Sequence, residues 1–421
     1  MGNPSADIKT APRNHLTRTE ILNQTRRRMG NAFSPNQILG RTQTIGCTAV
    51  EITQRCNLDC TLCYLSEHSE SVRDIPMEAV LARLDDAVSN YGTGTHVQIT
   101  GGDPTLRKHS ELIAIVEYAA AIGLHPALFT NGIAAPRRLL KRLAAVGLCD
   151  VAFHVDTTQR RPGYDSEQDL NALRLEYLER ARDLGLMVIF NTTIHAGNIN
   201  EVPMLVRFFT EHADAVGFAS FQLQAGTGRG VWGSREMVVS QLHVRALIEQ
   251  AAGRLLPWDV VRIGHPRCHS YMPLLVIGRS LYPVVADQDL FAEFLRDFTT
   301  VTADRHSSVI QLVCQYARAL LARPGWCYRG LQYLCQFLWQ ARRDILKSGF
   351  RINKLSFFIQ DFMNADGLDQ ERIDACSFMV MTTNGPVSMC AHNARRDDYI
   401  LKPITVTRAD GSVIEFQPLD N

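Results

Sequence analysis

Several features are missing from this 421-residue sequence, and each absence excludes a class of protein. No run of about eighteen apolar residues occurs, so no transmembrane helix is predicted. The 44 basic and 43 acidic residues give a formal net charge of +1, which argues against a nucleic-acid binder that relies on a basic field. No secretory signal opens the sequence. We therefore expect a cytoplasmic protein, at most peripheral to the inner membrane face, without a disulfide framework.

Cysteine is abundant, with eleven residues, and three of them stand together as Cys56, Cys60 and Cys63, directly before Tyr64. This C-x3-C-x2-C spacing puts three thiols on one short loop. Three thiolates can hold three irons of a [4Fe–4S] cluster and leave the fourth iron open for chemistry. The alternatives are a zinc site or three unrelated core cysteines. Zinc takes four ligands, usually in paired C-x2-C clusters, and no second pair lies nearby.

From Cys47 to about Gln224, short β-rich runs alternate with amphipathic stretches, which predicts βα units and a parallel sheet. The expected strands are Ala49–Thr53, His96–Thr100, Pro126–Thr130, Asp150–Val155, Met187–Ile194 and Val216–Gln224. The expected helices are Met77–Tyr91, Ser110–Ala121, Pro136–Val146, Leu170–Leu184 and Val202–His212. Six such steps predict a partial (β/α)6 TIM-like barrel with one open side. Its chemistry should lie at the carboxyl ends of the strands, where the cysteine loop also falls.

The flanking regions follow other patterns, so we expect an N-terminal extension (1–46), a core barrel (47–232) and a C-terminal α+β extension that contains cysteines (233–421). The first region is polar and irregular, which indicates a lead-in segment or a short helix lying on the body. The last region should contain a helix, a strand pair, an apolar helical stretch interrupted at Pro324-Gly325, and two β-hairpins. These are expected at Arg235–Ala252, Leu274–Val285, Val309–Leu346, Asn384-Gly385 and Asp410-Gly411.

A second motif, Gly101-Gly102-Asp103-Pro104, follows the second expected strand. Two glycines let the backbone approach a ligand closely, and the carboxylate of Asp103 can accept a hydrogen bond from an ammonium group. Alone, this motif indicates only a turn.

Together, the cysteine spacing and the glycine-rich turn one βα unit later resemble the radical S-adenosylmethionine (SAM) superfamily, over roughly Ala49 to Gln224. The resemblance implies a catalytic [4Fe–4S] cluster on Cys56, Cys60 and Cys63. It also implies that Tyr64 contacts the adenine and that the glycine-rich turn binds the methionine amino group. The cluster would cleave SAM reductively to a 5′-deoxyadenosyl radical for C–H activation, with an electron donor such as flavodoxin or ferredoxin. The usual glutamate of the turn is an aspartate here.

Four further candidates for SAM binding follow in the order expected for this superfamily: Asn131 and Asp156 at the ends of the third and fourth strands, and Asn191 and Gln222 on the fifth and sixth. A buried carboxylate such as that of Asp156 needs donors, and the ribose hydroxyls would supply two. For the others, polar side chains on strands indicate either a lined cavity or satisfied core residues.

The remaining cysteines suggest a second metal centre. Cys376 and Cys390 flank one expected hairpin, Cys268 precedes a strand, and Cys47 precedes the first strand. These four could hold an auxiliary [4Fe–4S] cluster, with a nearby histidine (His265, His269 or His392) replacing one of them. The alternative is that they are buried free thiols.

The same tail also resembles a narrower group, which contains the archaeal tetraether lipid synthases and the pterin C-methylating enzymes. The resemblance is carried by Cys47, His265-Pro266-Arg267-Cys268, Asp361-Phe362-Met363, Asp369 to Arg372, and Cys376 through Cys390-Ala391-His392-Asn393. It implies carbon–carbon bond formation on a lipid chain. The alternatives are methyl transfer to a pterin-like or heteroaromatic substrate, peptide modification, or a non-catalytic metal-binding scaffold. The sequence lacks a rubredoxin-like cysteine set and a second C-x3-C-x2-C motif, which leaves the substrate and the number of clusters open.

The apolar stretch Val309–Leu346 contains Cys314, Cys327 and Cys335 at helical spacing, with aromatics between them. The simpler interpretation is a core helix. The alternative is a greasy channel or a peripheral membrane contact beside Arg342-Arg343, which would admit a lipid substrate.

Overall fold

The computed structural model describes residues 16–232, 238–298, 309–408 and 410–419. In these residues, eleven strands form one sheet in the order β11-β10-β1-β2-β3-β4-β5-β6-β9-β7-β8. The six strands of the expected barrel pair in parallel and in sequence order. Their bounds are β1 Cys47–Thr53, β2 His96–Gly101, β3 His125–Thr130, β4 Asp150–His154, β5 Met187–Ile194 and β6 Val216–Leu223. The predicted partial barrel is therefore confirmed.

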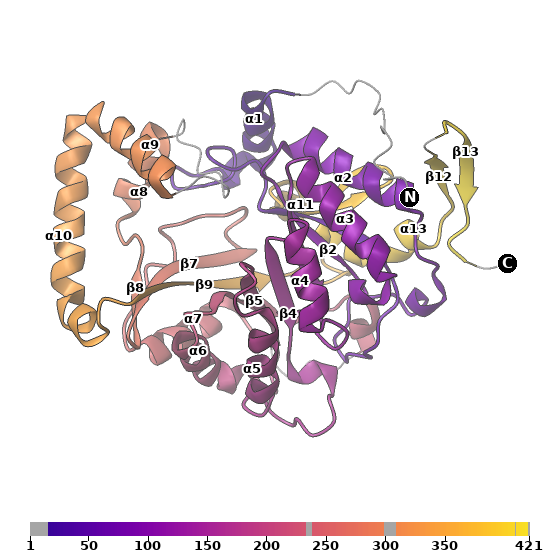
Figure 1. Cartoon of the computed structure of the whole chain (residues 1–421), viewed down its shortest axis with the longest axis horizontal. Helices are drawn as coiled ribbons and strands as arrows, with labels where there is room; N and C mark the ends of the chain where they lie inside the picture. The colour runs from indigo at the N-terminus through magenta and orange to yellow at the C-terminus, as the bar shows by residue number, and fades with distance from the viewer. Residues whose placement is uncertain (1–15, 233–237, 299–308, 409, 420–421) are drawn as a thin grey trace.

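Five helices connect these strands and cover their outer face (Figure 1). They are α2 Met77–Tyr91, α3 His109–Ala121, α4 Arg137–Ala145, α5 Leu170–Ala181 and α6 Val202–Glu211, each within three residues of its predicted bounds. Alternate strand residues such as Val50, Leu128 and Phe190 pack against these helices in one large apolar core. Their neighbours in sequence face the interior of the barrel, because strand side chains alternate between the two faces.

Strands from the C-terminal region extend the sheet on both sides. β9 (Ile352–Asp361) runs parallel to β6, and β10 (Phe378–Thr382) runs parallel to β1. β7 (His269–Ile277) and β8 (Ser280–Pro283) form the predicted strand pair, and β11 (Gly385–Ser388) completes the predicted hairpin with β10. The sequence did not predict β9. The signal was present but was not used: Leu355, Phe357 and Ile359 alternate with Ser356, Phe358 and Gln360, and Phe358 is the one apolar residue that interrupts the alternation.

The N-terminal region contributes a helix, α1 (Arg18–Met29), which packs on the body through Ile21 and Met29. Of the two structures expected for this region, a short helix lying on the body is the one observed. Residues 235–237 of the expected helix Arg235–Ala252 lie outside the described part. In the described part the helix begins later than expected, since residues 238–240 are not helical and α7 spans Gln241–Ala252. Ser240 caps the N-terminus of α7, because its hydroxyl accepts a hydrogen bond from the backbone N–H of His243 at 3.3 Å.

The C-terminal region also contains helices and one further hairpin. The helices are α8 Gln288–Asp297, α9 Val309–Leu321, α10 Pro324–Lys347, α11 Gln370–Asp374, α12 Met389–Ala394 and α13 Arg396–Ile400. α9 and α10 confirm the predicted interruption at Pro324, and the hairpin of β12 (Ile404–Thr407) with β13 (Val413–Phe416) confirms the second predicted turn. Short 3-10 turns lie between many of the elements, at 30–32, 69–71, 104–106, 157–159, 199–201 and 228–232.

One prediction for this region was wrong, because Cys314, Cys327 and Cys335 are exposed rather than part of the core. The α9–α10 hairpin stands at the edge of the molecule (Figure 1). α10 packs on β7 and β8 through Ala341 and Ile345, and Trp326 near its start contacts Phe294 and Phe298 of the α8 segment. None of the helices in the described ranges is both long and apolar enough to cross a membrane.

Candidate functional site

The three closely spaced cysteines lie on the loop that leaves β1 at the carboxyl edge of the barrel, and all three are half-buried. Neighbouring loops hold this segment in place. The backbone N–H of Thr61 donates to the carbonyl of Thr158 at 2.9 Å, and the N–H of Gly230 donates to the carbonyl of Cys63 at 3.0 Å. The loops after β4 and β6 therefore fix the cysteine loop from two sides.

Arg229, which sequence reasoning did not identify, contacts the cysteine loop directly. Its Nη2 lies 3.3 Å from Cys63 Sγ, and its Nη1 lies 3.1 Å from the carboxylate of Asp59. The signal was present in Gly228-Arg229-Gly230, a glycine-flanked cation just after the sixth strand. A fixed cation beside a thiol stabilises the thiolate form.

The other charges near the thiols are mainly negative. Burial raises the pKa of Cys60, and the nearby Cys63, Asp156 and Cys56 raise it further. Burial also raises the pKa of Cys56, with contributions from Asp103 and Cys63. Thiolates in these surroundings require compensating positive charge, which iron would supply. The donor set therefore fits a cluster bound through three thiolates. Within the described ranges, no three Cys, His, Asp or Glu side chains are arranged to hold a single metal ion.

The glycine-rich turn packs against the chain that enters the cysteine loop. The N–H of Gly102 donates to Thr53 at 2.9 Å, and the N–H of Asp103 donates to Arg55 at 2.8 Å. A Cβ on Gly101 would lie 1.9 Å from the Thr53 carbonyl oxygen, and one on Gly102 would lie 2.0 Å from that of Arg55. Glycine is required here for contact between two segments of backbone.

Asp103 has a different role from the expected one. Its carboxylate is fully buried and accepts hydrogen bonds from the N–H of Thr105 at 3.0 Å, the hydroxyl of Thr130 at 2.8 Å and the N–H of Asn131 at 2.8 Å. These donors satisfy it within the protein, so it does not face a ligand ammonium group. Pro104 is also buried and begins the short turn that Asp103 caps. The carboxylate thus ties the second strand to the third.

Asn131 connects this turn to the cysteine loop. Its side-chain Nδ2 donates to Asn57 Oδ1 at 2.6 Å and lies 3.9 Å from Cys56 Sγ. The structure therefore brings Asn131 to the cysteines, as its position after the third strand suggested.

Tyr64 points toward the barrel and makes two contacts there. Its hydroxyl donates to the carbonyl oxygen of Gly101 at 2.7 Å, and the guanidinium of Arg396 lies 4.6 Å from the centre of its ring. Arg396 is buried and paired with Glu51 of β1. Arg396 was not predicted, because α13 reaches the site from the far end of the chain and no local pattern marks it.

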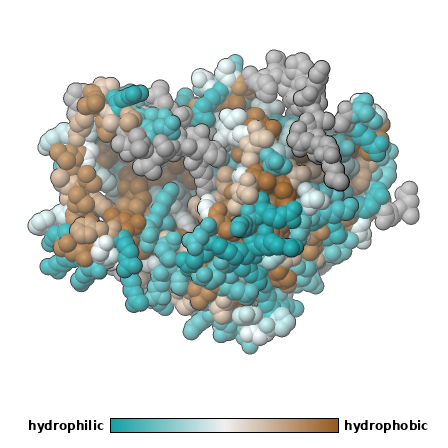
Figure 2. Space-filling view, in the orientation of Figure 1, coloured by the Kyte–Doolittle hydropathy of each residue, from teal (hydrophilic) through white to brown (hydrophobic). Residues whose placement is uncertain are grey.

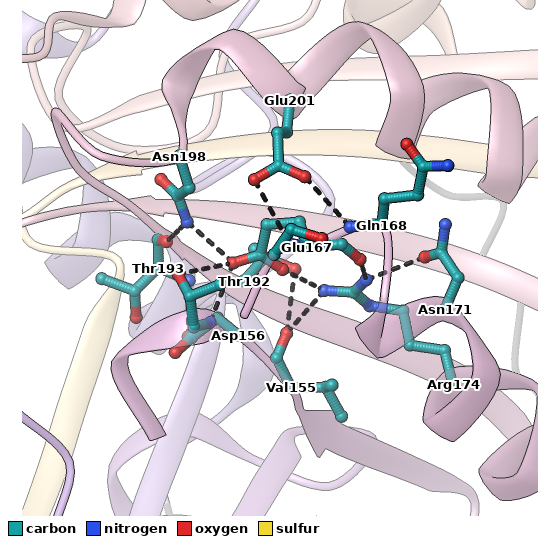
Figure 3. A network of polar contacts seen from close by, with 12 residues as sticks. Val155, Asp156, Glu167, Gln168, Asn171, Arg174, Thr192, Thr193, Asn198 and Glu201 are labelled. Carbon is teal, nitrogen blue, oxygen red and sulfur yellow. Dashed lines mark hydrogen bonds and ion pairs between the residues drawn. The ribbon is translucent and has the colours of Figure 1, made fainter. Parts of the chain in front are cut away.

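Asp156 departs from the expectation in the same way as Asp103 (Figure 3). It is fully buried, and its donors are protein groups: the N–H of Thr158 at 3.0 Å, the N–H of Thr193 at 2.8 Å and the ring of His154 at 2.6 Å. Burial would raise the pKa of Asp156, but the charge of His154 and these hydrogen bonds outweigh it and lower the pKa well below its usual value. Ribose hydroxyls are not needed to satisfy this carboxylate.

A buried ion pair supports the loop that follows β4. Glu167 and Arg174 are both fully buried and paired, and Arg174 also donates to the carbonyl of Val155 at 2.9 Å (Figure 3). Glu167 accepts from the N–H of Thr157 at 2.9 Å. Because the next residue, Thr158, holds the cysteine loop, this pair positions that loop from behind.

Asn191 and Gln222 lie on the inner face of neighbouring strands β5 and β6. Gln222 pairs with Thr193 across these strands and with Gln360 of β9. Asn191 is buried and Gln222 is half-buried. Next to them, an aromatic group of Phe218, Tyr271, Phe358 and Phe378 lines the same face, with the Phe218 and Phe358 ring centres 5.7 Å apart.

The four cysteines of the expected second centre come from distant parts of the chain: the start of β1, the loop before β7, the loop before β10, and α12. The β1–β10 pairing sets Cys47 opposite Phe378, two residues after Cys376. The end of β9 and the residues after it contact the other two, since the N–H of Asp361 donates to the carbonyl of Cys268 and that of Met363 lies against Cys390 Sγ. Burial raises the pKa of Cys47 well above its usual value, and Cys376 raises it further. Burial also raises the pKa of Cys268 to about 11 and that of Cys390 to about 12, and the thiol of Cys376 contributes to both.

Three protein donors contact these thiols. Gln98 Nε2 lies 3.1 Å from Cys47 Sγ, and Arg372 Nε lies 3.2 Å from Cys268 Sγ. The backbone N–H of Met363 lies 3.4 Å from Cys390 Sγ. Hydrogen bonds of this kind to sulfur are typical of thiolates that bind iron–sulfur clusters.

Residues 50–209 match the sequence model of the Radical SAM superfamily. This part of the chain is therefore a radical SAM domain. Such a domain implies SAM and a [4Fe–4S] cluster as cofactors, and it indicates an enzyme.

Two curated relatives of this radical SAM protein are enzymes with different substrates. A 7,8-dihydro-6-hydroxymethylpterin dimethyltransferase from Methanocaldococcus jannaschii is 28% identical over 186 residues, which are 43% of this chain and 36% of the relative. A PqqA peptide cyclase from Bradyrhizobium diazoefficiens is 26% identical over 216 residues, 49% of this chain and 54% of the relative. The chain thus spans between about a third and half of the length of these relatives.

Among solved structures, Streptococcus suis SuiB bound to the precursor peptide SuiA is similar over 48% of this chain and 44% of that one. Its sequence identity is 17% and its TM-score is 0.39.

Proposed function

We propose that this protein is a radical SAM enzyme in which Cys56, Cys60 and Cys63 bind the catalytic [4Fe–4S] cluster. Together with SAM, that cluster would supply one-electron cleavage to methionine and a 5′-deoxyadenosyl radical, which activates a C–H bond. The observation that supports this most is the set of three half-buried thiols at the carboxyl edge of the barrel, surrounded by negative groups and contacted by one fixed arginine.

The surrounding residues would position the cofactors. Arg229 neutralises part of the charge on Cys63, and Asn131 fixes the loop beside Cys56. The hydroxyl of Tyr64 donates to the carbonyl oxygen of Gly101 and so holds the glycine-rich turn. The same hydrogen bond keeps the tyrosine ring next to the predicted SAM site. Asp103 and Asp156 act indirectly. Asp103 orients the backbone of Asn131, and Asp156 orients that of Thr158, which holds the cysteine loop.

Anaerobic reconstitution tests this proposal. The reconstituted full chain, given SAM and dithionite, should release 5′-deoxyadenosine, and Cys60→Ala should abolish that release and lower the iron content. Cys314→Ala is the matched control, because Cys314 is exposed and distant in sequence from the loop. Release of 5′-deoxyadenosine at the wild-type rate by Cys60→Ala would contradict the assignment.

For the substrate, we propose an apolar chain, with carbon–carbon bond formation as the reaction. The aromatic group on the inner face, which includes Phe218 and Phe358, supports an apolar or aromatic substrate over a charged one. The relative that acts as a pterin dimethyltransferase favours the alternative of methyl transfer, and the peptide cyclases favour peptide modification.

Isotopic labelling separates these reactions. With SAM labelled in its methyl group, methyl transfer carries the label into the product, whereas coupling of two substrate carbons leaves the product unlabelled. Comparison of lipid extracts from a deletion strain and its parent then identifies the substrate class. An unchanged lipid profile would contradict the lipid assignment.

We also propose an auxiliary [4Fe–4S] cluster bound by Cys47, Cys268, Cys376 and Cys390. The mutual effects on their pKa values and the three donors to sulfur support it. Cys376→Ser should lower the iron content from about eight to about four per chain, since each cubane contains four irons. Cys314→Ser should leave it unchanged. Equal iron content in Cys376→Ser and the wild type would contradict the second cluster.

An electron donor such as flavodoxin or ferredoxin would reduce the catalytic cluster. The domain division into 1–46, 47–232 and 233–421 also remains part of this proposal. Because β9 and β10 pair with barrel strands β6 and β1, we expect the last region to be required for folding of the barrel.

A further inference from the structure

The outer side of α10 carries an exposed apolar stripe. Tyr328, Leu331, Leu338, Trp339 and Leu346 share one side of the helix, because intervals of three and seven residues return to nearly the same face. Their exposed fractions are 72%, 61%, 45%, 68% and 67%. Figure 2 shows the apolar surface that runs along this helix. Scattered exposed apolar side chains are ordinary, but a continuous row on one helix marks an interaction site.

A neighbouring side of α10 is packed, which fixes the direction of the stripe. Ala341 and Ile345 are buried against Ile277 and Tyr282 of the β7–β8 pair. The hydroxyl of Tyr282 donates to the carboxylate of Asp344 at 2.7 Å. The helix therefore cannot turn its apolar stripe inward without breaking this cluster.

Charge is distributed unevenly around the stripe. Residues 309–351 contain seven of the chain's 44 basic residues and only one of its 43 acidic residues, Asp344, which bonds to Tyr282. The basic residues are Arg318, Arg323, Arg329, Arg342, Arg343, Lys347 and Arg351. Since the whole chain has a net charge of +1, the rest of it is negative. Positive charge is thus concentrated on the α9–α10 hairpin.

We propose that the outer face of α10 docks on an anionic lipid surface, with the helix lying in the plane of the interface. The apolar stripe and the positive charge both fit such a surface. Apolar side chains with tryptophan enter the membrane interface, and the surrounding cations attract anionic headgroups. Trp339 lies in the middle of the row, and the guanidinium of Arg342 lies 4.0 Å from the centre of its ring, so the two side chains would enter together.

A second copy of the chain is a poorer occupant for this face. Arg329 already pairs with Glu293, so two copies that met through α10 would bring together mainly Arg342 and Arg343 of each copy. The acidic residue of the hairpin, Asp344, is bonded to Tyr282 on the packed side. Docking through α10 does not depend on the chemistry at the cysteine loop. It would place the barrel at a surface where an apolar substrate is available.

Vesicle binding of the full chain tests the proposal without any cofactor. Cosedimentation should show binding to phosphatidylcholine vesicles that contain phosphatidylglycerol, with weak binding to phosphatidylcholine alone and weaker binding at high salt. Arg342→Ala and Arg343→Ala should each weaken binding about fivefold, because each cation near an anionic surface contributes a similar share. Leu338→Ser with Trp339→Ser should weaken it at least tenfold.

The controls change exposed residues elsewhere. Leu255→Ser alters a side chain that is 84% exposed, and Val413→Ser one that is 64% exposed, so both should leave vesicle binding unchanged. Circular dichroism and thermal melting verify that each variant is folded. Equal binding by the Leu338 and Trp339 double variant and the wild type would overturn the proposal. Absence of binding to either vesicle, with self-association that this double variant abolishes, would overturn it in favour of a second copy.

Discussion

Arg396 links the far C-terminal region to the cysteine loop, and its removal should destabilise the protein strongly. Its guanidinium pairs with the carboxylate of Glu51 on β1 at 2.8 Å, donates to Gln54 at 3.2 Å and lies over the ring of Tyr64. Both charged side chains are almost completely buried, at 2% and 5% exposure. Arg396→Ala therefore leaves a buried carboxylate without its main partner.

The size of the effect follows from Glu51. Burial would raise the pKa of this carboxyl, but attraction to Arg396 and His392, with hydrogen bonds from Arg396 and Gln54, lowers it from 4.5 to about 2. A shift of this size corresponds to about 3 kcal/mol, at about 1.4 kcal/mol per pKa unit. Loss of one partner of a buried pair typically costs about 3–5 kcal/mol. We therefore expect Arg396→Ala to lower the free energy of unfolding by about 3 kcal/mol at pH 7.

The pH dependence gives an independent measure. Because the pKa of Glu51 is lower in the folded state, its stabilisation is complete above pH 4.5 and is lost as the pH falls toward 2. The difference between wild type and Arg396→Ala should therefore shrink as the pH falls below 4.5.

Urea denaturation of the full chain at pH 7 and at pH 3.5 measures both quantities. Arg395→Ala is the matched control, because Arg395 is the adjacent arginine and is exposed. Glu51→Gln combined with Arg396→Ala should recover part of the lost stability, since it removes the unpaired charge. If Arg396→Ala costs no more than Arg395→Ala, or its cost is the same at both pH values, the reasoning is wrong.

Three further outcomes are expected. Arg229→Gln removes the cation 3.3 Å from Cys63 Sγ and should lower the reduction potential of the bound cluster by about 50 mV, at about 59 mV per 1.4 kcal/mol; an unchanged potential in an EPR redox titration would count against the contact. Gly101→Ala places a Cβ 1.9 Å from the Thr53 carbonyl oxygen and should lower the thermal midpoint sharply, whereas Gly163→Ala, with open space around it, should cost much less. Glu167→Gln removes one partner of a fully buried pair and should cost about 3 kcal/mol in urea denaturation; a cost below about 1 kcal/mol would refute the supporting role of the pair.

The barrel could be predicted from sequence because its signals are local. Strands such as Met187–Ile194 and helices such as Met77–Tyr91 were predicted with their observed bounds, since apolar periodicity within each segment reflects its own burial. The cysteine loop was placed correctly for the same reason, as it directly follows the first strand.

The errors arose where the answer depends on distant partners. Asp103 and Asp156 were read as ligand contacts because their donors, such as the N–H of Asn131 and of Thr193, come from other strands. Arg396 was missed because its partner Glu51 lies 345 residues away. The cysteines of α9 and α10 were assigned to the core since composition does not tell which side of a helix is covered.

The sheet order has a consequence for how the protein is made. Strands β1 to β6 leave the ribosome first, yet β1 pairs with β10 and β6 pairs with β9, so both edges of the barrel stay unpaired until residues near the end of the chain have been synthesised. Open edges of this kind invite pairing with other chains. Cys47 and Cys376 meet only through the β1–β10 pairing, so the proposed auxiliary ligand set is assembled last. Loading of iron at that centre would thus report that synthesis and folding are complete.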